Sequence, residues 1–355
     1  MIFHIFPYEK FTNDYIVRIN KLFDSKEHIF FVYGNKHDSE IRSVKADNVI
    51  FDNQMSFVEK KRIINKYIKE SQKVIIHSLF CGLKILVLLR IKQNKYGKKY
   101  FWNIWGADLY NAYWNRNKTI KNRIVEIFRK RFIRDLPAVG YIKGDYEFLV
   151  KNYNTNAKFF LASYTYDFYV PEVDKSKEDM ESVNILLGNS ATRECQYIEA
   201  LDMLSEYKDR PIKIKCVLSY PDNCDAYRDE VVEYGRKIFG NKFEPLVDFM
   251  TYEKYLQLLS GIDIAIFNHN RQQALGNIAG LLYLGKRVYI NPENACKQFF
   301  EDIGASVYST RDLNSDAICK TDSDNLKIKN RKMIDLFFSD EQFAERWRRI
   351  FENNW

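Results

Sequence analysis

A run of large polar residues stands between an apolar strand pattern at residues 262–267 and an apolar helical pattern that ends at Gly285. The residues of this run and of the helix opening are Arg271, Gln272, Gln273, Gly276 and Asn277. Backbone N–H groups at a helix N-terminus, with a guanidinium beside them, attract phosphate groups and other anions. The arrangement therefore predicts an anion site, with Arg271 on charged oxygens and a glutamine on a neighbouring sugar. A solvated loop that only caps the helix is the alternative.

A second turn of the same kind follows the strand pattern at residues 183–187. It begins with Gly188, whose missing Cβ lets a ligand approach the backbone, and continues with three side chains that suit a helix N-terminus. These three residues are Asn189, Ser190 and Thr192. The turn lacks the GxGxxG spacing of a dinucleotide fingerprint, so a diphosphate site and an ordinary strand-to-helix turn both stay open. Ser219, at the end of the next strand pattern, is a further candidate for binding the same ligand.

Two candidate catalytic side chains follow strand patterns in the first half of the chain. Asp108 comes after the strand pattern at residues 100–105, and His77 lies at the end of the one at residues 73–78. Ligands of open α/β sheets bind at the carboxyl ends of the strands. Asp108 is therefore a candidate general base for a hydroxyl group, with an N-cap aspartate as the alternative. For His77, a hydrogen-bonded structural histidine competes with a catalytic role.

Residues 114–136 combine a helical apolar period with an excess of basic side chains. Ile120, Ile124 and Ile127 recur at the spacing of one helix face. The basic residues around them include Lys121, Arg129, Lys130 and Arg131. A basic amphipathic helix with aromatic residues suits an anionic membrane surface. The alternative is a domain helix that packs its apolar side on the sheet and leaves a solvated basic face.

The composition is that of a folded cytoplasmic protein with a moderately basic charge. Of the 355 residues, 46% are hydrophobic, and the formal net charge of +8 suits an anionic partner such as a nucleotide or a phospholipid surface. Six cysteines without a CxxC pair, and no secretory signal pattern, favour reduced thiols. The longest apolar run is too short to span a bilayer, so any membrane association is expected to be peripheral. No nucleic-acid module is recognisable, and no nucleic-acid partner is expected.

Metal-dependent chemistry finds little support in the sequence. Asp322 and Asp324 form a D-x-D pattern that holds a divalent metal in one class of sugar-nucleotide enzymes. They lie in a polar segment with no strand before it, so we expect a solvated loop. No HExxH, GxSxG or P-loop motif is present. We therefore expect no metal cofactor.

Strand patterns alternate with helical patterns along most of the chain, which predicts parallel strands in doubly wound α/β sheets. Residues 169–183 contain a proline and dense charge with little apolar content, which is typical of an interdomain linker. We expect a first domain at residues 1–168 and a second at residues 184–338. The amphipathic tail at residues 339–355 either crosses back to the first domain or packs on its own domain.

Three stretches of the chain resemble the Fuc4NAc transferases of enterobacterial common antigen synthesis. They read NIWGADLY, LLGNSATRECQYIEAL and YEKYLQLLSGIDIAIFNHNRQQALGNIAGLLYLGKRVYI. Enzymes of that family move 4-acetamido-4,6-dideoxygalactose from a TDP-sugar to a lipid-linked disaccharide. The similarity runs over most of the chain in the same order, is strongest at residues 183–291 and is thin after about residue 310.

The resemblance implies a GT-B fold, in which two Rossmann-like domains face a cleft and the second domain binds most of the donor. It also implies a glycosyltransferase without an essential metal, acting at the inner face of the plasma membrane. In such enzymes helix dipoles and basic side chains neutralise the leaving diphosphate. Gly188, Asn189, Ser190 and Arg271 match positions suited to that task, and Asp108 would lie on the acceptor side.

The chain departs from the family at His269 and Asn270, just before the R-Q-Q motif, where we expect the donor sugar to be selected. The expected partners are a TDP- or UDP-sugar donor, a lipid-linked or other glycan acceptor, and an anionic membrane surface. One alternative is a GT-B transferase that uses UDP-GlcNAc or GDP-fucose on a capsular or protein acceptor. The other is a non-catalytic sugar-binding partner subunit that shares the fold.

Overall fold

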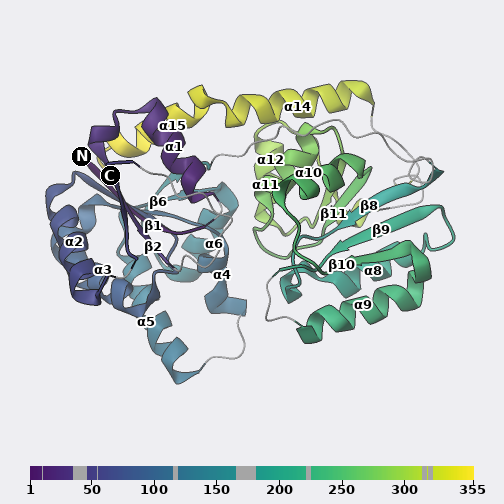
Figure 1. Cartoon of the computed structure of the whole chain (residues 1–355), viewed down its shortest axis with the longest axis horizontal. Coiled ribbons are helices and arrows are strands. Elements are labelled where there is room, and N and C mark those ends of the chain that lie inside the picture. The colour runs from purple at the N-terminus through teal and green to yellow at the C-terminus, as the bar shows by residue number, and fades with distance from the viewer. Residues whose placement is uncertain are drawn as a thin grey trace. The chain divides into compact units, whose positions relative to one another are not determined.

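The computed structural model divides the chain into two compact units, each built on one parallel sheet (Figure 1). Unit 1 comprises Met1–Tyr166 and Phe338–Trp355, and unit 2 comprises Asp167–Phe337. The structure describes residues 1–9, 11–34, 46–53, 55–114, 119–164, 181–220, 225–313, 318 and 323–355. Most of the predicted linker at residues 169–183 lies outside the described residues.

The sheet of unit 1, sheet A, has seven strands in the order β3-β2-β1-β4-β5-β6-β7. Every pairing in it is parallel. The strands are β1 (Ile2–Pro7), β2 (His28–Tyr33), β3 (Val49–Phe51), β4 (Lys73–His77), β5 (Tyr100–Asn103), β6 (Ala138–Tyr141) and β7 (Lys158–Leu161). β1, β4, β5 and β6 are buried along their whole length. Strands that are buried along their whole length are typical of parallel sheets, because helices cover both faces.

The helices of unit 1 include one that comes from the end of the chain. They are α1 (Thr12–Leu22), α2 (Phe57–Glu70), α3 (Gly82–Tyr96), α4 (Ala107–Trp114), α5 (Ile120–Arg134), α6 (Lys143–Tyr153) and α15 (Asp340–Glu352). On α15 the fully buried Trp347 donates its indole N–H to the backbone oxygen of Ser163 at 3.0 Å. Arg18 of α1 forms an ion pair with Asp340 at 2.7 Å. The C-terminal tail is therefore part of the core of unit 1 (Figure 1).

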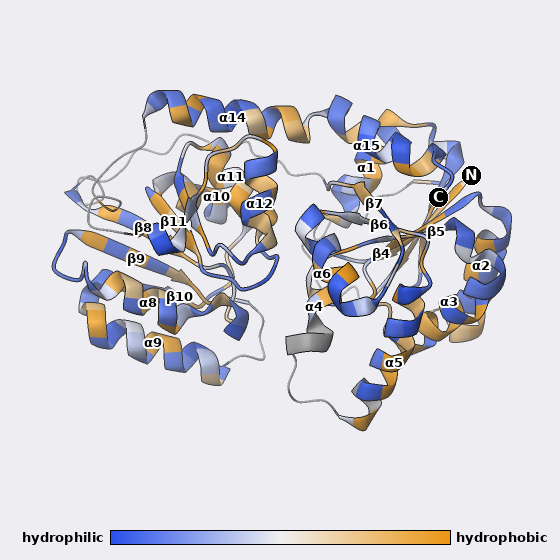
Figure 2. Ribbon diagram, turned by 180° about the vertical axis from the view of Figure 1, so that it is seen from behind, coloured by the Kyte–Doolittle hydropathy of each residue, from blue (hydrophilic) through white to orange (hydrophobic). Residues whose placement is uncertain are grey.

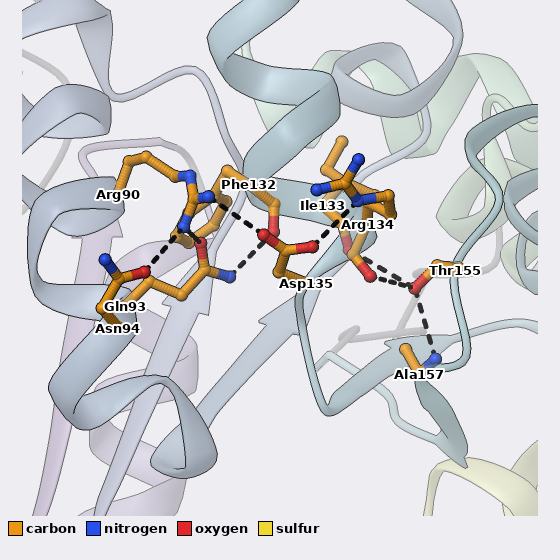
Figure 3. Close-up of polar contacts among 9 residues, drawn as sticks. All are labelled: Arg90, Gln93, Asn94, Phe132, Ile133, Arg134, Asp135, Thr155 and Ala157. Carbon is orange, nitrogen blue, oxygen red and sulfur yellow. Dashed lines mark hydrogen bonds and ion pairs between the residues drawn. The ribbon is translucent and has the colours of Figure 1, made fainter.

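The end of α5 is fixed to α3 and to the segment before β7 (Figure 3). Gln93 donates from Nε2 to the backbone oxygen of Phe132 at 2.8 Å, and Arg90 pairs with Asp135 at 3.0 Å. Thr155 donates to backbone oxygens in the last turn of the same helix. These contacts anchor the C-terminal turns of α5 in the domain.

The sheet of unit 2, sheet B, has six strands in the order β10-β9-β8-β11-β12-β13, again with parallel pairings. The strands are β8 (Val183–Leu187), β9 (Ile212–Val217), β10 (Phe243–Leu246), β11 (Ile264–Phe267), β12 (Arg287–Ile290) and β13 (Tyr308–Ser309). The helices are α8 (Tyr197–Ser205), α9 (Asp225–Phe239), α10 (Tyr252–Gly261), α11 (Leu275–Tyr283), α12 (Ala295–Asp302) and α14 (Asp324–Phe338). The prediction of doubly wound α/β sheets is confirmed for both units.

Each sheet reverses its strand order once. In sheet A the chain adds β2 and β3 on one side of β1 and then places β4 on the other side. In sheet B it adds β9 and β10 on one side of β8 and then places β11 on the other side. Such a reversal opens a crevice outside the carboxyl ends of the two central strands, and open α/β sheets bind their ligands there. The pairs β1–β4 and β8–β11 therefore mark where to look for sites.

Candidate functional site

Both predicted anion-binding turns lie at the strand reversal of sheet B. The first follows β8 and the second follows β11, and the two strands are paired neighbours. Gln273 joins the turns, since its Nε2 donates to Asn189 Oδ1 at 2.9 Å and to Ser190 Oγ at 2.6 Å. The backbone N–H of Asn270 also donates to the oxygen of Glu194 at 3.1 Å. Two segments about 80 residues apart in the sequence thus form a single site.

Cys195 and His269 are buried neighbours at this site. Their exposed fractions are 1% and 0%. Burial raises the pKa of the Cys195 thiol, but the charge of His269 and hydrogen bonds with Ser190 and Thr192 outweigh burial and bring the pKa to about 6. The thiol therefore takes on thiolate character close to neutral pH. His269 lowers the pKa of the thiol through its charge and through a hydrogen-bonding approach, although neither ring nitrogen has a hydrogen bond of standard geometry.

Several polar atoms of the site are buried without a hydrogen-bond partner. They are Nδ1 and Nε2 of His269, Oδ1 of Asn270 and Oε1 of Gln273. A buried polar group without a partner destabilises the fold by about 1–3 kcal/mol. A cluster of such groups in two joined turns indicates a place where a polar ligand supplies the missing partners. His269 and Asn270, predicted to select the donor sugar, both belong to the cluster.

The N-terminus of α11 faces this loop without a side-chain cap. Its N-cap residue, Ala274, has a φ of 61°, in the left-handed region, and accepts no helix N–H with its side chain. The half-buried Gly276 and Asn277 lie in the first turn of this helix. Arg271 is half-buried as well and donates to the backbone oxygen of Gln272 at 3.0 Å. An uncapped helix start with a guanidinium beside it suits an anion.

The remaining predicted donor residues lie in or beside the two turns, and Gly188 also has a structural explanation. Gly188 has a φ of 66°, and a Cβ there would lie 2.3 Å from the hydroxyl of Tyr197. Glycine is thus required by the packing of that ring, whether or not a ligand approaches. Thr192 lies 3.3 Å from Ser190 Oγ within the turn, and Gln272 is buried. Ser219 lies one residue before Tyr220, whose backbone oxygen accepts from Ala191 at 2.5 Å.

At the carboxyl edge of sheet A, Asp108 is fully buried and holds two turns together. Its carboxylate accepts from the N–H groups of Leu79 and Trp105 at 2.9 Å each and from the indole of Trp102 at 3.0 Å. Burial raises the pKa of Asp108, while these hydrogen bonds and Arg129 act in the opposite direction. The role of general base stays a prediction, and the geometry favours a turn-stabilising carboxylate. His77 is also fully buried and hydrogen-bonded at both ring nitrogens.

The predicted membrane helix needs one correction. Arg129 is only 6% exposed, and its guanidinium donates to the backbone oxygens of Asp108 and Leu79 at 3.0 and 3.3 Å. It therefore braces the turns beside Asp108 and cannot face a membrane. Lys130 and Arg131 are exposed as predicted for such a surface, whereas the side chain of Lys121 lies outside the part of the chain that the structure describes.

The apolar face of α5 divides along its length. Ile120, Ile124 and Ile127 are exposed by 78%, 47% and 52%, whereas Phe132 and Ile133 are fully buried. The interpretation of α5 as a helix whose apolar side packs on the domain is thus correct only for its last turns. Figure 2 shows apolar and hydrophilic segments alternating along this helix.

The D-x-D pattern lies partly outside the described residues, which include Asp324 but not Asp322. Asp324 begins α14 and pairs with Lys327 at 3.3 Å. Within the described ranges, no group of three or more His, Cys, Asp or Glu side chains is placed to hold a metal ion. In the same ranges, no helix has the length and apolar character needed to cross a membrane.

The sequence interpretation missed Cys195, which is buried between the two turns, and the histidines His4 and His28 of unit 1. The signal for Cys195 was its position three residues after Thr192, in the predicted helix opening. The helix expected near residues 195–206 is present as α8, but it starts at Tyr197, because a 3₁₀ turn at Arg193–Cys195 and Gln196, whose φ of 49° is left-handed, precede it. No local pattern marks His4 and His28, because their partners lie on other strands.

Two Rossmann-like units, the second with a polar site at its strand reversal, define the GT-B class of fold. Solved structures with this fold include a glycosyltransferase from Rickettsia africae ESF-5, with a TM-score of 0.66 at 13% identity over 99% of this chain and 97% of that one. Another is a sucrose-phosphate synthase from Thermosynechococcus elongatus, with a TM-score of 0.67 at 10% identity over 99% and 98% of the two chains. A third, described as "Trehalose-6-phosphate from E. coli bound with UDP-2-fluoro glucose", has a TM-score of 0.66 at 10% identity over 99% of each chain.

The chain belongs to the 4-alpha-L-fucosyltransferase family, glycosyl transferase group 56, whose model matches residues 8–354. The family predicted from the three sequence stretches is thereby confirmed. The protein is a glycosyltransferase, so its substrates are a nucleotide-sugar donor and a glycan acceptor.

Proposed function

We propose that the protein transfers a deoxyamino sugar of the Fuc4NAc type from a TDP-sugar to a lipid-linked glycan in bacterial surface polysaccharide synthesis. The observation that carries this proposal is the bridge from Gln273 to Asn189 and Ser190, which makes one site from the two turns. Sequence similarity to the Fuc4NAc transferases is strongest over those same turns. The unpartnered groups of His269 and Asn270 supply the polar contacts that an acetamido sugar needs.

In this proposal the site neutralises the leaving diphosphate with fixed protein groups. The uncapped N-terminus of α11 presents N–H groups, and Arg271 adds a full positive charge at the same loop. Preorganised donors of this kind stabilise charge that develops in the transition state. We propose that they act without a divalent cation. Transferase activity should then persist in excess EDTA and should not rise when Mg²⁺ or Mn²⁺ is restored. Complete loss in EDTA with recovery on Mg²⁺ would contradict this step.

We place the acceptor at the carboxyl edge of sheet A. The half-buried Phe11 and Trp105 pack against each other there, with ring centroids 4.7 Å apart. Half-buried aromatic rings at a strand reversal suit the face of a sugar ring. Trp105→Ala should therefore raise the KM for the acceptor while the donor affinity stays unchanged. An unchanged acceptor KM would move the acceptor to another part of the protein.

We further propose that the first turns of α5 touch an anionic membrane surface, where a lipid-linked acceptor is available. Ile120, Ile124 and Ile127 form one exposed apolar face, and the exposed Lys130 and Arg131 follow on the same helix. Apolar insertion next to basic side chains is the pattern of peripheral helices on anionic lipid. Binding to vesicles that contain phosphatidylglycerol, and none to pure phosphatidylcholine vesicles, is the expected result.

A thermal-shift panel of sugar nucleotides tests the donor directly. A ligand that binds only the folded state raises its stability with concentration. TDP-sugars should raise the melting temperature more than UDP- or GDP-sugars at equal concentration. A larger shift with UDP-GlcNAc or GDP-fucose would replace the donor in the proposal. Donor hydrolysis in the absence of acceptor excludes a non-catalytic sugar-binding subunit.

A further inference from the structure

Three buried histidines of unit 1 form a continuous line of hydrogen bonds across sheet A. His28 begins β2, His4 lies in the middle of β1, and His77 ends β4. His4 Nε2 lies 3.1 Å from His28 Nδ1, and His4 Nδ1 lies 3.1 Å from His77 Nε2. On the far side, His77 Nδ1 lies 2.7 Å from the hydroxyl of Tyr164. We call these four residues the histidine chain.

A fifth residue favours one direction of the hydrogen bonds. Trp105 donates its indole N–H to the phenolic oxygen of Tyr164 at 2.5 Å, and an indole nitrogen can only donate. The arrangement that uses every proton of the histidine chain then has Tyr164 donating to His77 Nδ1. His77 donates from Nε2 to His4, and His4 donates from Nε2 to His28. Each ring therefore holds its proton on Nε2 and accepts on Nδ1.

The two ends of the histidine chain lie at opposite edges of the sheet. His28 lines a cavity of about 480 Å³ at the amino edge, whose lining includes the exposed side chains of Lys98 and Arg348. Exposed groups in the lining show that this cavity opens to solvent. Tyr164 and Trp105 lie at the carboxyl edge, beside the strand reversal of β1 and β4. The histidine chain thus connects solvent at one edge with the proposed acceptor position at the other.

The surroundings keep the three rings neutral. Burial lowers the pKa of His4 and His77 well below the usual value, and it lowers the pKa of His28 to about 4. The charged groups that act on His28 are the N-terminal amine, which lowers its pKa further, and Asp24, which raises it. Around His4 and His77 the packed groups are aromatic, from α1 and α15 as well as from the sheet, with Tyr15 and Trp347 among them. Neutral rings of this kind pass a proton by exchanging which nitrogen holds it.

We propose that the histidine chain carries a proton from the acceptor at the carboxyl edge of unit 1 to the cavity at the amino edge during glycosyl transfer. This proposal rests on the proposed function, in which the acceptor binds at that carboxyl edge. A structural role alone is a weaker explanation, because apolar side chains of similar shape would fill the same core with equal or greater stability. Proton transfer requires a line of hydrogen-bonded groups that reaches solvent at one end and the reacting hydroxyl at the other.

The step balances as follows. The acceptor oxygen bonds to the anomeric carbon of the donor as the bond from that carbon to the diphosphate oxygen breaks. The acceptor proton goes to the Tyr164 oxygen, the Tyr164 proton to His77 Nδ1, the His77 Nε2 proton to His4 Nδ1, and the His4 Nε2 proton to His28 Nδ1. The Nε2 proton of His28 leaves to water in the cavity. When the site is empty, His28 takes up a proton from that water and each ring passes its proton back toward Tyr164. The proton that Tyr164 took from the acceptor leaves to water at the carboxyl edge, which restores the first arrangement.

Substitution of the central ring tests the relay. His4→Phe and His4→Gln should both lower kcat by about 10²-fold, the usual range for loss of proton transfer, with the KM for the donor unchanged. Glutamine can donate to one neighbour and accept from the other, so a purely positioning role would be rescued in His4→Gln. Near-normal kcat in His4→Gln would therefore overturn the relay.

A matched pair of tyrosine variants separates the relay from general packing. Tyr164→Phe should lower kcat as far as His4→Phe does. Tyr146→Phe removes another phenolic hydrogen bond of unit 1, to the backbone oxygen of Ala157 at 3.0 Å, and should leave kcat unchanged. For the wild type, kcat should be lower in D2O than in H2O. Its dependence on the fraction of D2O should show that more than one proton moves in the transition state. Equal activity of the two tyrosine variants would overturn the proposal.

A measurement independent of turnover keeps failure of the relay distinct from failure of the proposed function. Nitrogen NMR of histidine-labelled protein at pH 7 should show three neutral rings with the proton on Nε2. His28→Asn should shift the ring-nitrogen signals of His77, two links away. Unmoved His77 signals would overturn the chain even if the enzyme is fully active. If the His77 signals do shift but the wild type does not transfer the sugar to the proposed acceptor, the histidine chain stands and the proposed function is contradicted.

Discussion

The two units share one topology and use its strand reversal in opposite ways. At the β8–β11 reversal of unit 2, two polar turns meet, and several of their buried atoms lack a partner. At the β1–β4 reversal of unit 1, His4 and His77 are hydrogen-bonded to each other, and their other ring nitrogens are bonded to His28 and Tyr164. Aromatic rings cover both histidines. The first site is prepared to receive a polar ligand, whereas the histidines of the second already have their partners within the unit. The buried side chain of Asn103, which pairs with His77 across β4 and β5, is an unpartnered group at the second site. The same sheet order therefore fixes where a site lies, and the residues after the strands decide what kind it is.

The largest expected effect tests whether the C-terminal helix α15 completes the core of unit 1 and whether unit 1 unfolds independently of unit 2. Trp347→Ala removes a fully buried indole of α15 that also donates to Ser163. Loss of a large core side chain destabilises by about 3–5 kcal/mol. We expect this loss for the unfolding of unit 1 in urea, with unchanged nucleotide binding by unit 2. The exposed Arg349→Ala on the same helix should change stability by less than about 0.5 kcal/mol. Parallel loss of nucleotide binding would show that the two units do not behave separately.

Next in size is the effect of removing the guanidinium from the open site of unit 2. Arg271→Ala should lower kcat/KM by about 10²–10³-fold, because charge that develops on the diphosphate loses a fixed partner. Stability should hardly change, since Arg271 makes one hydrogen bond, to its neighbour Gln272. Arg311→Ala, which removes an exposed guanidinium paired with Glu293 in the same unit, is the matched control. Wild-type kinetics in the Arg271 variant would remove it from the site.

The pH dependence of stability should separate the two units. When folding lowers the pKa of a histidine, the unfolded state binds more protons than the folded state at acidic pH. The free energy of unfolding therefore falls as the pH drops below about 6.5. For His28 this loss continues to about pH 4, at about 1.4 kcal/mol per pH unit. The Cys195 thiol, with its pKa lowered to about 6, contributes stability above the unfolded value of about 8.5 that is lost as pH falls to 6.

Calorimetry across pH measures both windows. Unit 2 should lose stability mainly between pH 8.5 and 6, and Cys195→Ser should abolish that loss. Unit 1 should lose stability mainly below pH 6.5, and His28→Gln should reduce the slope. If the unfolding transitions of the two units shift together at every pH, the predicted difference between the titrating groups of the two strand reversals is wrong.

The sequence predicts the fold well because the signals for it are local. Apolar strand runs, the polar residues after them and the helix openings all lie within a few residues of one another, and the sheets of both units follow from them. The two turns of unit 2 were likewise found from Gly188 to Thr192 and from Arg271 to Asn277. Their joining through Gln273 was not, because that contact depends on the pairing of β8 with β11.

The errors concern side chains whose partners lie far along the chain. Arg129 looked like one more basic residue of an amphipathic helix, yet it bonds to backbone oxygens 21 and 50 residues away. The histidine chain needs the register of three strands, which places His4 between His28 and His77. Charge and periodicity cannot reveal such contacts, since they describe only the neighbours of a residue in the sequence.

The smallest expected effect concerns the exposed end of α5. Membrane binding by this helix is a property proposed for unit 1 and not for unit 2. Arg131→Glu should weaken binding to anionic vesicles by about 1 kcal/mol for each charge removed near the surface, without loss of stability, because Arg131 is exposed. Ile124→Ser should weaken binding at high salt as well, since apolar insertion is not screened by ions. Arg129→Glu should instead destabilise unit 1, because it buries a carboxylate beside the backbone oxygens of Asp108 and Leu79. Equal vesicle binding by the wild type and the Arg131 and Ile124 variants would assign this face of α5 to solvent, and the membrane contact would have to lie elsewhere.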